Sequence, residues 1–548
     1  MSQVFTFLVG GKAGQGVRSA GSTAASVFND MGRAVFQMDD YPSLIRGGHN
    51  FSVVSTSPAE ISSHYLEAQL VVALDQRSYD RHNGHLDDDG VMVHDADVDG
   101  DGVSLPITEK AEEYERPDLI SGVASIASLC AAIGMTPARL ETVVRRAYSS
   151  HVEDNLSYAM AIYEAADDEI GGRFSLETGD HRGGALLTGN QAIALGAASA
   201  GLNNYFAYPM TPATSILHFL AGHARDLGIA VMQPENEIAA ANMAIGAAFA
   251  GSRVMVASSG GGYALMEEAF SMAGMVEAPV LFVLSMRPGP STGVPTYTGQ
   301  GDLDMALHQG HGEFPRIVAS PGGIGEAFSL AGELLSMVWR FQTPGVLLTE
   351  KHCSESAMNV SLDPGAVPWA EPEMHPGGGY GRYRLTDTGV SPLLFPPSGQ
   401  TVKWNSYECD ENGITTEDAD TIAVMHDKRQ RKQQALREHL RDMATVNVHG
   451  DAGPVIATYG STTLSVLEAL RHGGLDARVV QPVYLEPFPS WELDGYDDVV
   501  VVEQSAAGSF EQLLREKTGV SVAAHVRRYD GRPFAPAALA AELEGVLP

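Results

Sequence analysis

The sequence predicts a multidomain α/β protein, with three α/β domains following one another along the chain. Two observations predict this class. Short apolar runs of strand length alternate with segments of helical spacing over most of the 548 residues, and repeated alternation of this kind is typical of parallel sheets. With 44% apolar and 19% charged residues the composition is globular, and the length suffices for about three or four cores.

The first domain is expected over residues 1–175. It opens with an apolar strand at 4–9, a glycine loop at 10–16 and a helix rich in small residues at 17–31. Later strands are expected at 70–74 and 91–93, and helices at 120–132 and 139–148. The charged, glycine-containing residues 169–184 are typical of a linker.

Two further α/β domains are expected, at residues 185–360 and 451–548. The strands of the former are expected at 204–208, 253–257 and 280–285, between alanine-rich helical stretches. Those of the latter are expected at 455–459, 477–481 and 499–503, with a helix at 463–472. The intervening residues 361–450 contain a segment rich in Pro, Gly and aromatic residues and a charged helix at about 418–444. We expect this stretch to wrap other domains rather than form its own core.

The charge and cysteine content exclude several functions. The chain has 35 Lys and Arg against 68 Asp and Glu, a formal net charge of −33, which does not supply the basic clusters that bind nucleic acid. Cys130, Cys353 and Cys409 form no C-x-x-C pair, so neither a disulfide framework nor a local zinc or iron–sulfur site is expected. A signal peptide is not apparent, and the apolar runs are too short to span a bilayer. We expect a cytoplasmic protein without a membrane partner.

The first strand leads into the loop Gly11-x-x-Gly14-x-Gly16. Such a loop can direct backbone N–H groups and a helix N-terminus at an anion, although it does not match the G-x-G-x-x-G dinucleotide pattern. A tight strand-to-helix turn that binds nothing explains it equally well. Downstream, Arg46 and His49 stand beside flexible glycines, where the guanidinium could hold a phosphate or bridge to another domain.

The second domain carries the motif Tyr208-Pro-Met-Thr-Pro-Ala-Thr214 directly after an expected strand. Its two prolines stiffen the turn and hold the Thr211 hydroxyl at the carboxyl edge of the sheet, where open α/β folds place ligands. The alternative is a threonine that only caps the next helix.

Glu237 opens an expected helix that otherwise consists of small and apolar residues, which implies tight burial. A carboxyl group on that face would be partly desolvated, and such groups commonly exchange protons in catalysis. The alternative is that Glu235 and Glu237 only stabilise the helix N-terminus.

A third motif follows the strand at 280–285 and contains Arg287 and Thr296 on a bend rich in Pro and Gly. From this bend the two side chains could converge on a carboxylate through a charge-assisted hydrogen bond. A surface ion pair is the more usual role of a lone arginine after a strand. The rigid and uncharged loop favours a ligand instead.

These motifs, in this order, resemble the 2-oxoacid:ferredoxin oxidoreductases, in the form that fuses a gamma-type domain ahead of the alpha-type domain. GGKAGQGV and DYPSLIRGGHN are similar to the gamma-type α/β domain. YPMTPAT, PENEIAA and RPGPSTGVPT are similar to the doubly wound thiamine pyrimidine-binding domain, with Met210 in place of the isoleucine of the family's YPITP signature. VVEQ at 501–504 and YDGRPF at 529–534 are similar to a transketolase C-terminal-like domain.

The resemblance implies roles for individual residues. In the family, the glutamate in the place of Glu237 hydrogen-bonds the aminopyrimidine ring of thiamine diphosphate and starts catalysis by proton exchange. Tyr208 and Pro209 would lie at the same cofactor. The substrate contacts of the family, which orient the 2-oxoacid, carry over to Thr211, Arg287 and Thr296. The candidates for contact with coenzyme A or between domains are Gly11, Gly14, Gly16 and Arg46.

The resemblance also implies a partner, because this chain would form only half of an active site. A diphosphate-Mg²⁺ site needs G-D-G followed by Asn, and the residues after Gly100-Asp-Gly102 do not supply the Asn, so we interpret that sequence as a turn. Three scattered cysteines cannot hold a cubane cluster, which takes four thiolates. A beta-type subunit is therefore expected to contribute the [4Fe-4S] cluster, the Mg²⁺ and the diphosphate site, in a dimer of heterodimers that reduces ferredoxin.

The fused form resembles the two-subunit 2-oxoglutarate type. The expected reaction converts 2-oxoglutarate, coenzyme A and oxidised ferredoxin to succinyl-CoA, CO₂ and reduced ferredoxin, or runs as the reverse carboxylation. Pyruvate or a broad range of 2-oxoacids stays open as substrate. A non-catalytic scaffold and a thiamine-dependent transferase without electron transfer are the alternatives from other classes. Two departures from the family, Cys409 in a histidine position and Gly260-Gly-Gly262 in place of S-G-P-G, do not touch the proposed chemistry.

Overall fold

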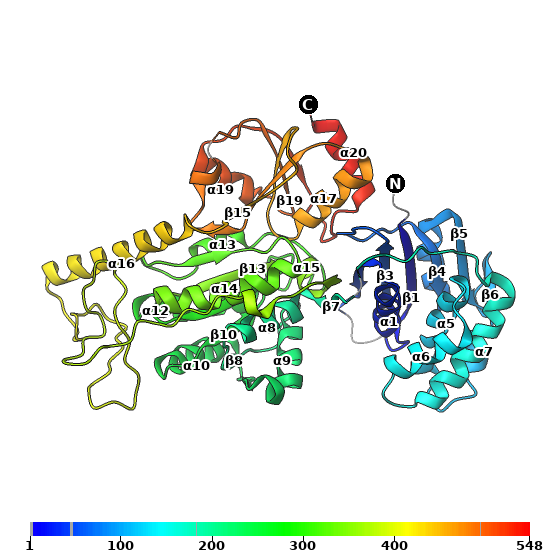
Figure 1. The fold of residues 1–548 in the computed structure, drawn as a ribbon, viewed down its shortest axis with the longest axis horizontal. Helices are drawn as coiled ribbons and strands as arrows, with labels where there is room; N and C mark the ends of the chain where they lie inside the picture. The colour runs from blue at the N-terminus through cyan, green and yellow to red at the C-terminus, as the bar shows by residue number, and fades with distance from the viewer. Residues whose placement is uncertain (1–3, 44–47, 182, 494, 548) are drawn as a thin grey trace. The chain divides into compact units, whose positions relative to one another are not determined.

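The computed structural model describes residues 4–43, 48–181, 183–493 and 495–547. The chain divides into two compact units, one formed by residues 1–187 and 356–361 and the other by residues 188–355 and 362–548. Each unit combines sheets with helices (Figure 1), so the predicted α/β class is confirmed. Within the described ranges, no helix combines the length and apolar character needed to cross a membrane.

The first unit is built on a mixed sheet in the order β6-β5-β4-β1-β3-β2-β14-β7. Its central strand β1 (Phe5–Lys12) runs parallel to β4 (Ala68–Ala73) and antiparallel to β3 (His49–Ser57). Because β1 extends to Lys12, Gly11 is a strand residue and the glycine loop is shorter than expected. The other strands are β2 (Ala34–Asp40), β5 (Leu86–Asp95), β6 (Val103–Leu105), β7 (Ala185–Thr188) and β14 (Ala357–Val360).

The helices of the first unit form its core with this sheet. Every residue of α5 (Val123–Ala132) is buried, because a helix without a charged side chain can face apolar neighbours on all sides. It packs against α7 (Val152–Ile170) and α1 (Val17–Asp30), the helix predicted at 17–31. The remaining helical segments are α2 (Gln76–His82), η1 (Asn83–His85), α3 (Ile107–Ala111), α4 (Pro117–Ile120) and α6 (Pro137–Ala147).

The second unit contains a sheet in the order β18-β12-β13-β11-β10-β8-β9, parallel except where β18 joins β12. The chain passes from β8 to β9 on one side and then returns to β10 on the other side of β8. This reversal of direction between β8 and β10 is a topological switch point, where open α/β sheets bind ligands. The bounds are β8 (Asn204–Phe206), β9 (Ala230–Met232), β10 (Val254–Ser258), β11 (Val280–Met286), β12 (Ile317–Ala319), β13 (Gly345–Glu350) and β18 (Tyr484–Glu486).

A second sheet in the same unit has the order β15-β17-β16-β19-β20. All neighbouring strands in this sheet are parallel, except for the antiparallel pair β15 and β17. It has its own switch point, between β16 and β19, because the chain goes from β16 to β17 on one side and then to β19 on the other. The bounds are β15 (Val446–His449), β16 (Val455–Ala457), β17 (Arg478–Pro482), β19 (Val499–Glu503) and β20 (Val522–Arg527).

Helices separate these strands, as the alternation in the sequence predicts. Those that precede β15 in the second unit are α8 (Gly189–Ser199), α9 (Thr214–Leu227), α10 (Glu237–Phe249), α11 (Gly260–Leu265), α12 (Glu267–Met275), α13 (Leu303–His308), α14 (Ile324–Phe341), α15 (Lys351–Glu355) and α16 (Ala419–Leu440). Those that follow are α17 (Thr462–Gly473), α18 (Ser490–Leu493), α19 (Ser509–Thr518) and α20 (Pro536–Val546).

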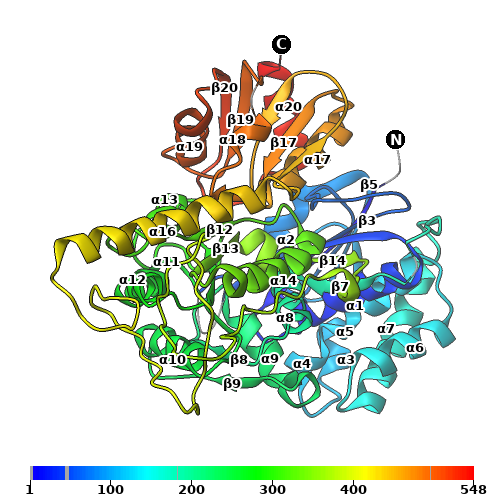
Figure 2. The ribbon, with the colours of Figure 1, turned by 60° about the vertical axis from the view of Figure 1, so that its left-hand side comes forward.

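Residues 361–418 have little regular structure apart from η2 (Pro364–Ala366). Figure 2 shows this segment as long loops beside α16, which is the charged helix predicted at 418–444. The segment packs within the second unit through buried side chains such as Arg382 and Tyr383. It therefore packs against other elements of that unit.

Candidate functional site

The candidate site lies at the switch point of the first sheet of the second unit. β8 and β10 are parallel neighbours, so the segments that follow them meet at one edge of the sheet. The segment after β8 contains Tyr208 and Thr211, and the segment after β10 contains Gly260 and Gly262. Ser258 Oγ, at the end of β10, donates to Met210 Sδ at 3.9 Å and joins the two segments.

Glu237 is the first residue of α10, and its side chain is only 3% exposed. The preceding Asn236 caps the helix by accepting a hydrogen bond from the Ala239 N–H at 2.9 Å. The capping amide leaves the neighbouring carboxyl group free to point elsewhere. Glu237 Oε1 is buried and has no hydrogen-bond partner among the described residues. A buried carboxyl oxygen without a partner is costly, so a ligand group that bonds it would gain affinity.

The glycines at 260–262 let the backbone of α11 approach the carboxyl group. A Cβ atom at Gly262 would collide with Glu237 Oε1 and Ser258 Oγ. A Cβ atom at Gly260 would collide with the carboxylate of Asp302. The two glycines therefore leave room for two carboxyl groups that pack against them, a role that the sequence alone does not reveal.

Arg287 follows β11 and turns back toward the segment after β8. Its Nη1 donates to the Thr211 carbonyl oxygen at 2.8 Å. Desolvation by burial lowers the pKa of Arg287, while the nearby Asp302 carboxylate opposes that shift. The structure therefore brings Arg287 and Thr211 together, although through the backbone of Thr211 rather than its hydroxyl.

Asp302 is a site residue that sequence reasoning missed. Burial raises the pKa of its carboxyl group to about 6, and the positive charge of Arg287 limits the rise. An acid with this pKa can hold or release a proton near neutral pH. The only sequence signal was its position at the end of the long loop that begins at Arg287.

The remaining predicted residues lie in the same loops. Thr296 is buried, and its hydroxyl has no hydrogen-bond partner within the described part of the chain. Tyr208 is 38% exposed, and Pro209 is half-buried beside it. Thr296 thus offers a free donor and acceptor from a rigid loop, and Tyr208 an exposed aromatic surface.

The glycine loop belongs to the first unit. Gly14 and Gly16 have positive φ angles of 101° and 75°, which favour glycine, and Gly16 caps α1. A Cβ atom at Gly14 would meet nothing within 4 Å, so this position faces open space. A Cβ atom at Gly11 would contact Gln15 and Val17, so that glycine is needed for packing. Arg46 lies outside the described residues.

The structure also bears on the metal and thiol expectations. In the described ranges, no group of three or more His, Cys, Asp or Glu residues could hold a metal ion. The three cysteines are free and buried. Burial raises the pKa of Cys130 and of Cys409 to about 12, and raises that of Cys353 as well. Gly100-Asp-Gly102 lies in the turn between β5 and β6, as interpreted from the sequence.

Comparison with known proteins points to one family. Residues 195–428 match the family model described as pyruvate flavodoxin/ferredoxin oxidoreductase, thiamine diphosphate-binding, and residues 6–165 match that of pyruvate ferredoxin/flavodoxin oxidoreductase. The alpha subunit of 2-oxoacid:ferredoxin oxidoreductase 2 from Aeropyrum pernix is 29% identical over 96% of this chain and 95% of its own length. The 2-oxoglutarate synthase subunit KorA of Archaeoglobus fulgidus is 31% identical over 60% of this chain and 90% of its own. A solved structure of 2-oxoglutarate:ferredoxin oxidoreductase from Magnetococcus marinus, with 2-oxoglutarate, coenzyme A and succinyl-CoA bound, matches with a TM-score of 0.90 and 26% identity over all of both chains.

Proposed function

The chain belongs to the 2-oxoacid:ferredoxin oxidoreductases as an alpha subunit, and we propose that it provides the acid that activates thiamine diphosphate and the contacts that orient the 2-oxoacid. One observation carries this proposal. The buried Oε1 of Glu237 has no hydrogen-bond partner among the described residues and packs against Gly262, where no side chain could fit, within the region that matches the thiamine-binding family model.

Glu237 fits the pyrimidine end of thiamine diphosphate. Its unused oxygen can share a proton with a ring nitrogen, and the small residues around it exclude water from that bond. Tyr208 and Pro209, which follow β8, offer an apolar surface for the pyrimidine ring. When bound, the cofactor supplies the nucleophilic carbon that attacks the 2-oxo group. Glu237 holds and exchanges the proton of the ring nitrogen.

The 2-oxoacid is oriented by the loops after β8 and β11. The guanidinium of Arg287, already anchored on the Thr211 carbonyl, supplies a positive charge for a substrate carboxylate. The free hydroxyl of Thr296 donates a hydrogen bond to the same ligand. Asp302, with its pKa near 6, lies beside Arg287 and balances that charge before the substrate binds.

We propose 2-oxoglutarate as the substrate, with coenzyme A and ferredoxin as co-substrates in either direction of the reaction. The full-length match to the Magnetococcus marinus 2-oxoglutarate enzyme and the Archaeoglobus fulgidus relative supports this choice. Pyruvate or a broad range of 2-oxoacids is the second candidate, because relatives of similar identity are named for 2-oxoacids in general and for ketoisovalerate. For coenzyme A we propose the loop at Gly14 and Gly16, together with Gly11 and Arg46.

A beta-type partner would complete the site, carrying the Mg²⁺, the [4Fe-4S] cluster and the diphosphate contacts, in a dimer of heterodimers. Support comes from large apolar side chains that lie at or beyond the carboxyl ends of the strands and remain exposed in this chain. They are Tyr208, Met232, Ile238, Leu265 and Val294. Exposed apolar side chains around a polar site are typical of a surface that another subunit covers. The free, reduced cysteines accord with a cytoplasmic location.

The test is Glu237→Gln in the complex obtained by coexpression with the subunit encoded in the neighbouring open reading frame. A glutamine has the same shape but cannot exchange the proton, so we expect reduction of ferredoxin or viologen by 2-oxoglutarate and coenzyme A to fall by about 10²-fold or more. Glu235→Gln is the matched control, because Glu235 lies two residues away and is exposed.

Full turnover by the Glu237→Gln complex would show that this chain is a scaffold and would end the proposal. Assaying the wild-type complex across a panel of 2-oxoacids tests the substrate. A higher kcat/KM for pyruvate than for 2-oxoglutarate would reject the 2-oxoglutarate assignment and leave the role of Glu237 intact. Iron analysis of the same complex separates it from a thiamine-dependent transferase, which would carry no cluster.

A further inference from the structure

The switch point of the C-terminal sheet is occupied by this chain itself. The segments that follow β16 and β19 contain Tyr459 and Gln504 and meet at the crevice where open α/β sheets hold small ligands. The side chain of Gln300 fills that crevice and is fully buried. Gln300 lies at the end of the loop that begins at Arg287.

Gln300 is held on every polar atom. Its backbone N–H donates to the Gln504 carbonyl at 2.8 Å, and its Oε1 accepts from the Gln504 N–H at 2.8 Å. Its Nε2 donates to the Tyr459 carbonyl at 3.0 Å, and Oε1 also accepts from the Thr462 hydroxyl at 3.0 Å. The Tyr459 hydroxyl donates to the Gln300 carbonyl at 3.4 Å. A glutamine bound in this way cannot shift without breaking several buried hydrogen bonds.

The same loop makes further contacts with the C-terminal part of the unit. The Thr298 N–H donates to the Gly531 carbonyl at 3.1 Å. The guanidinium of Arg532 lies 3.7 Å from the centre of the Tyr297 ring, a cation–π contact. These contacts flank Thr296, the proposed substrate contact. They come from the segments VVEQ and YDGRPF, for which the sequence offered only a resemblance.

We propose that Gln300 is a positioning residue for the substrate loop, residues 287–302. The crevice of the C-terminal sheet then holds this loop in place and does not bind a separate ligand. The sheet fixes residues 297–300 and thereby sets where Thr296 and Arg287 meet the carboxylate of the 2-oxoacid. This inference rests on the proposed function, because it explains how the loop that carries the proposed substrate contacts is held in place. It predicts an effect on 2-oxoacid binding and none on coenzyme A.

The experiment compares Gln300→Met with wild type in the complex with the partner subunit. Methionine keeps the length and volume of glutamine but makes none of the three side-chain hydrogen bonds, while the two backbone bonds of residue 300 remain. We expect KM for the 2-oxoacid to rise about tenfold or more, with kcat reduced less and KM for coenzyme A unchanged. Thr462→Val, which removes one of the bonds to Gln300, should shift the same KM in the same direction by a smaller factor and stays informative if the first variant folds poorly.

Gln481→Met is the matched control, because Gln481 is equally buried in β17 of the same sheet and bonds Glu326 instead of the loop. It should leave the KM for the 2-oxoacid unchanged. If folded Gln300→Met complex keeps the wild-type KM, or if both KM values rise together, the positioning role is wrong. The wild-type complex separates this outcome from the proposed function, because a wild type that fails to oxidise any 2-oxoacid would reject the function itself.

Discussion

Glu350 shows how burial changes a single residue in this protein. It ends β13 and is fully buried, with Oε1 accepting from the Ser461 N–H at 2.7 Å and from the Ser461 hydroxyl. Its Oε2 has no hydrogen-bond partner within the described part of the chain. Desolvation raises the pKa of this carboxyl group to about 7, while the bonds from Ser461 oppose the rise.

A raised carboxyl pKa makes stability depend on pH in a definite direction. The folded state binds the Glu350 proton more tightly than the unfolded state, so the stabilisation is complete below the unfolded pKa of about 4.5 and is lost as the pH rises to about 7. The loss is about 3 kcal/mol. Glu350→Gln cannot ionise and should lose less stability between pH 5 and pH 8, as measured by thermal unfolding.

The control for this prediction is Glu417→Gln, because Glu417 is exposed. That variant should keep the wild-type pH dependence. If Glu350→Gln loses as much stability as wild type over the same range, Glu350 is ionised in the folded protein and its pKa is not raised.

At the same scale, the sequence predicts some site residues better than others. The burial of Glu237 could be predicted, because the helix that it begins consists otherwise of small and apolar residues that pack closely against their neighbours. Asp302 could not, because an acid in an irregular loop has no periodicity that reports burial. The need for glycine at 262 depends on the approach of Glu237 from another helix, and this proximity exists only in the folded chain.

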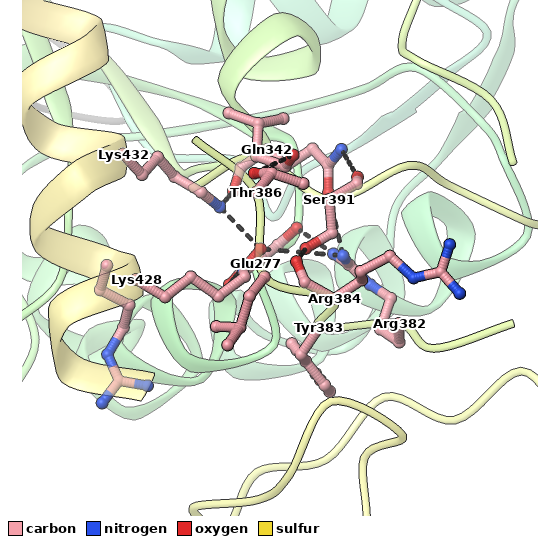
Figure 3. Close-up of polar contacts among 12 residues, drawn as sticks. Glu277, Gln342, Arg382, Tyr383, Arg384, Thr386, Ser391, Lys428 and Lys432 are labelled. Atoms are coloured by element: carbon pink, nitrogen blue, oxygen red, sulfur yellow. Dashed lines mark hydrogen bonds and ion pairs between the residues drawn. The ribbon is translucent and has the colours of Figure 1, made fainter. Parts of the chain in front are cut away.

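At the scale of elements, α16 is attached to the second unit by a buried ion cluster around Glu277 (Figure 3). Lys428 Nζ lies 2.5 Å from Glu277 Oε1, and Lys432 Nζ lies 2.7 Å from Glu277 Oε2. Arg382 from the irregular segment donates to the Glu277 carbonyl oxygen at 2.9 Å. The three cations keep the pKa of Glu277 below its usual range although burial opposes them, and burial lowers the pKa of Lys432 to about 7. Glu277, two residues beyond the end of α12, thus joins α16 through its carboxylate and Arg382 through its carbonyl oxygen and an ion pair of 3.7 Å.

Glu277→Gln should release these elements, because it leaves Lys428 and Lys432 buried without a charge partner. Removal of one partner from a buried ion pair costs about 3–5 kcal/mol. We expect faster amide hydrogen exchange in α16 and in residues 380–415, measured by mass spectrometry, before β10 and β11 are affected. Glu438→Gln, on the exposed side of the same helix, is the control. Unchanged protection of α16 in Glu277→Gln would show that packing alone holds the helix.

The sequence predicts the existence of α16 within a few residues, but not the orientation of its buried face. Met425, Lys428, Lys432, Leu436 and Leu440 are buried at helical spacing. Two of these buried positions are lysines, and a lysine in a helix normally indicates a solvent-exposed position. Their partner Glu277 lies 151 residues before Lys428 and 155 residues before Lys432 in the chain. Such long-range charge pairs leave no local pattern in the sequence. The pairing of β14 with β2 of the first unit could not be predicted either, because the two strands lie about 320 residues apart in the chain.

At the scale of the whole molecule, we expect the electrons to pass to an iron–sulfur cluster on another subunit. An iron–sulfur cluster takes four thiolates, whereas the chain has three cysteines in total. Each is a free, buried thiol whose pKa is raised by desolvation, which opposes the thiolate form that binds iron. We therefore expect the cluster of the proposed function on a partner subunit.

The corresponding prediction is that substitution of the cysteines does not change the iron content of the complex. Cys130→Ala, Cys353→Ala and Cys409→Ala each remove a small buried side chain, so each should lower thermal stability modestly, by about 1 kcal/mol. None should change the iron bound per complex or the rate at which viologen is reduced once folded protein is counted. Iron determination and a viologen-reduction assay on the copurified complex, both normalised to folded protein by a thermal unfolding signal, measure these two quantities. Loss of iron in any one folded variant would place a cluster ligand in this chain and would require electrons to pass through it rather than through the partner alone.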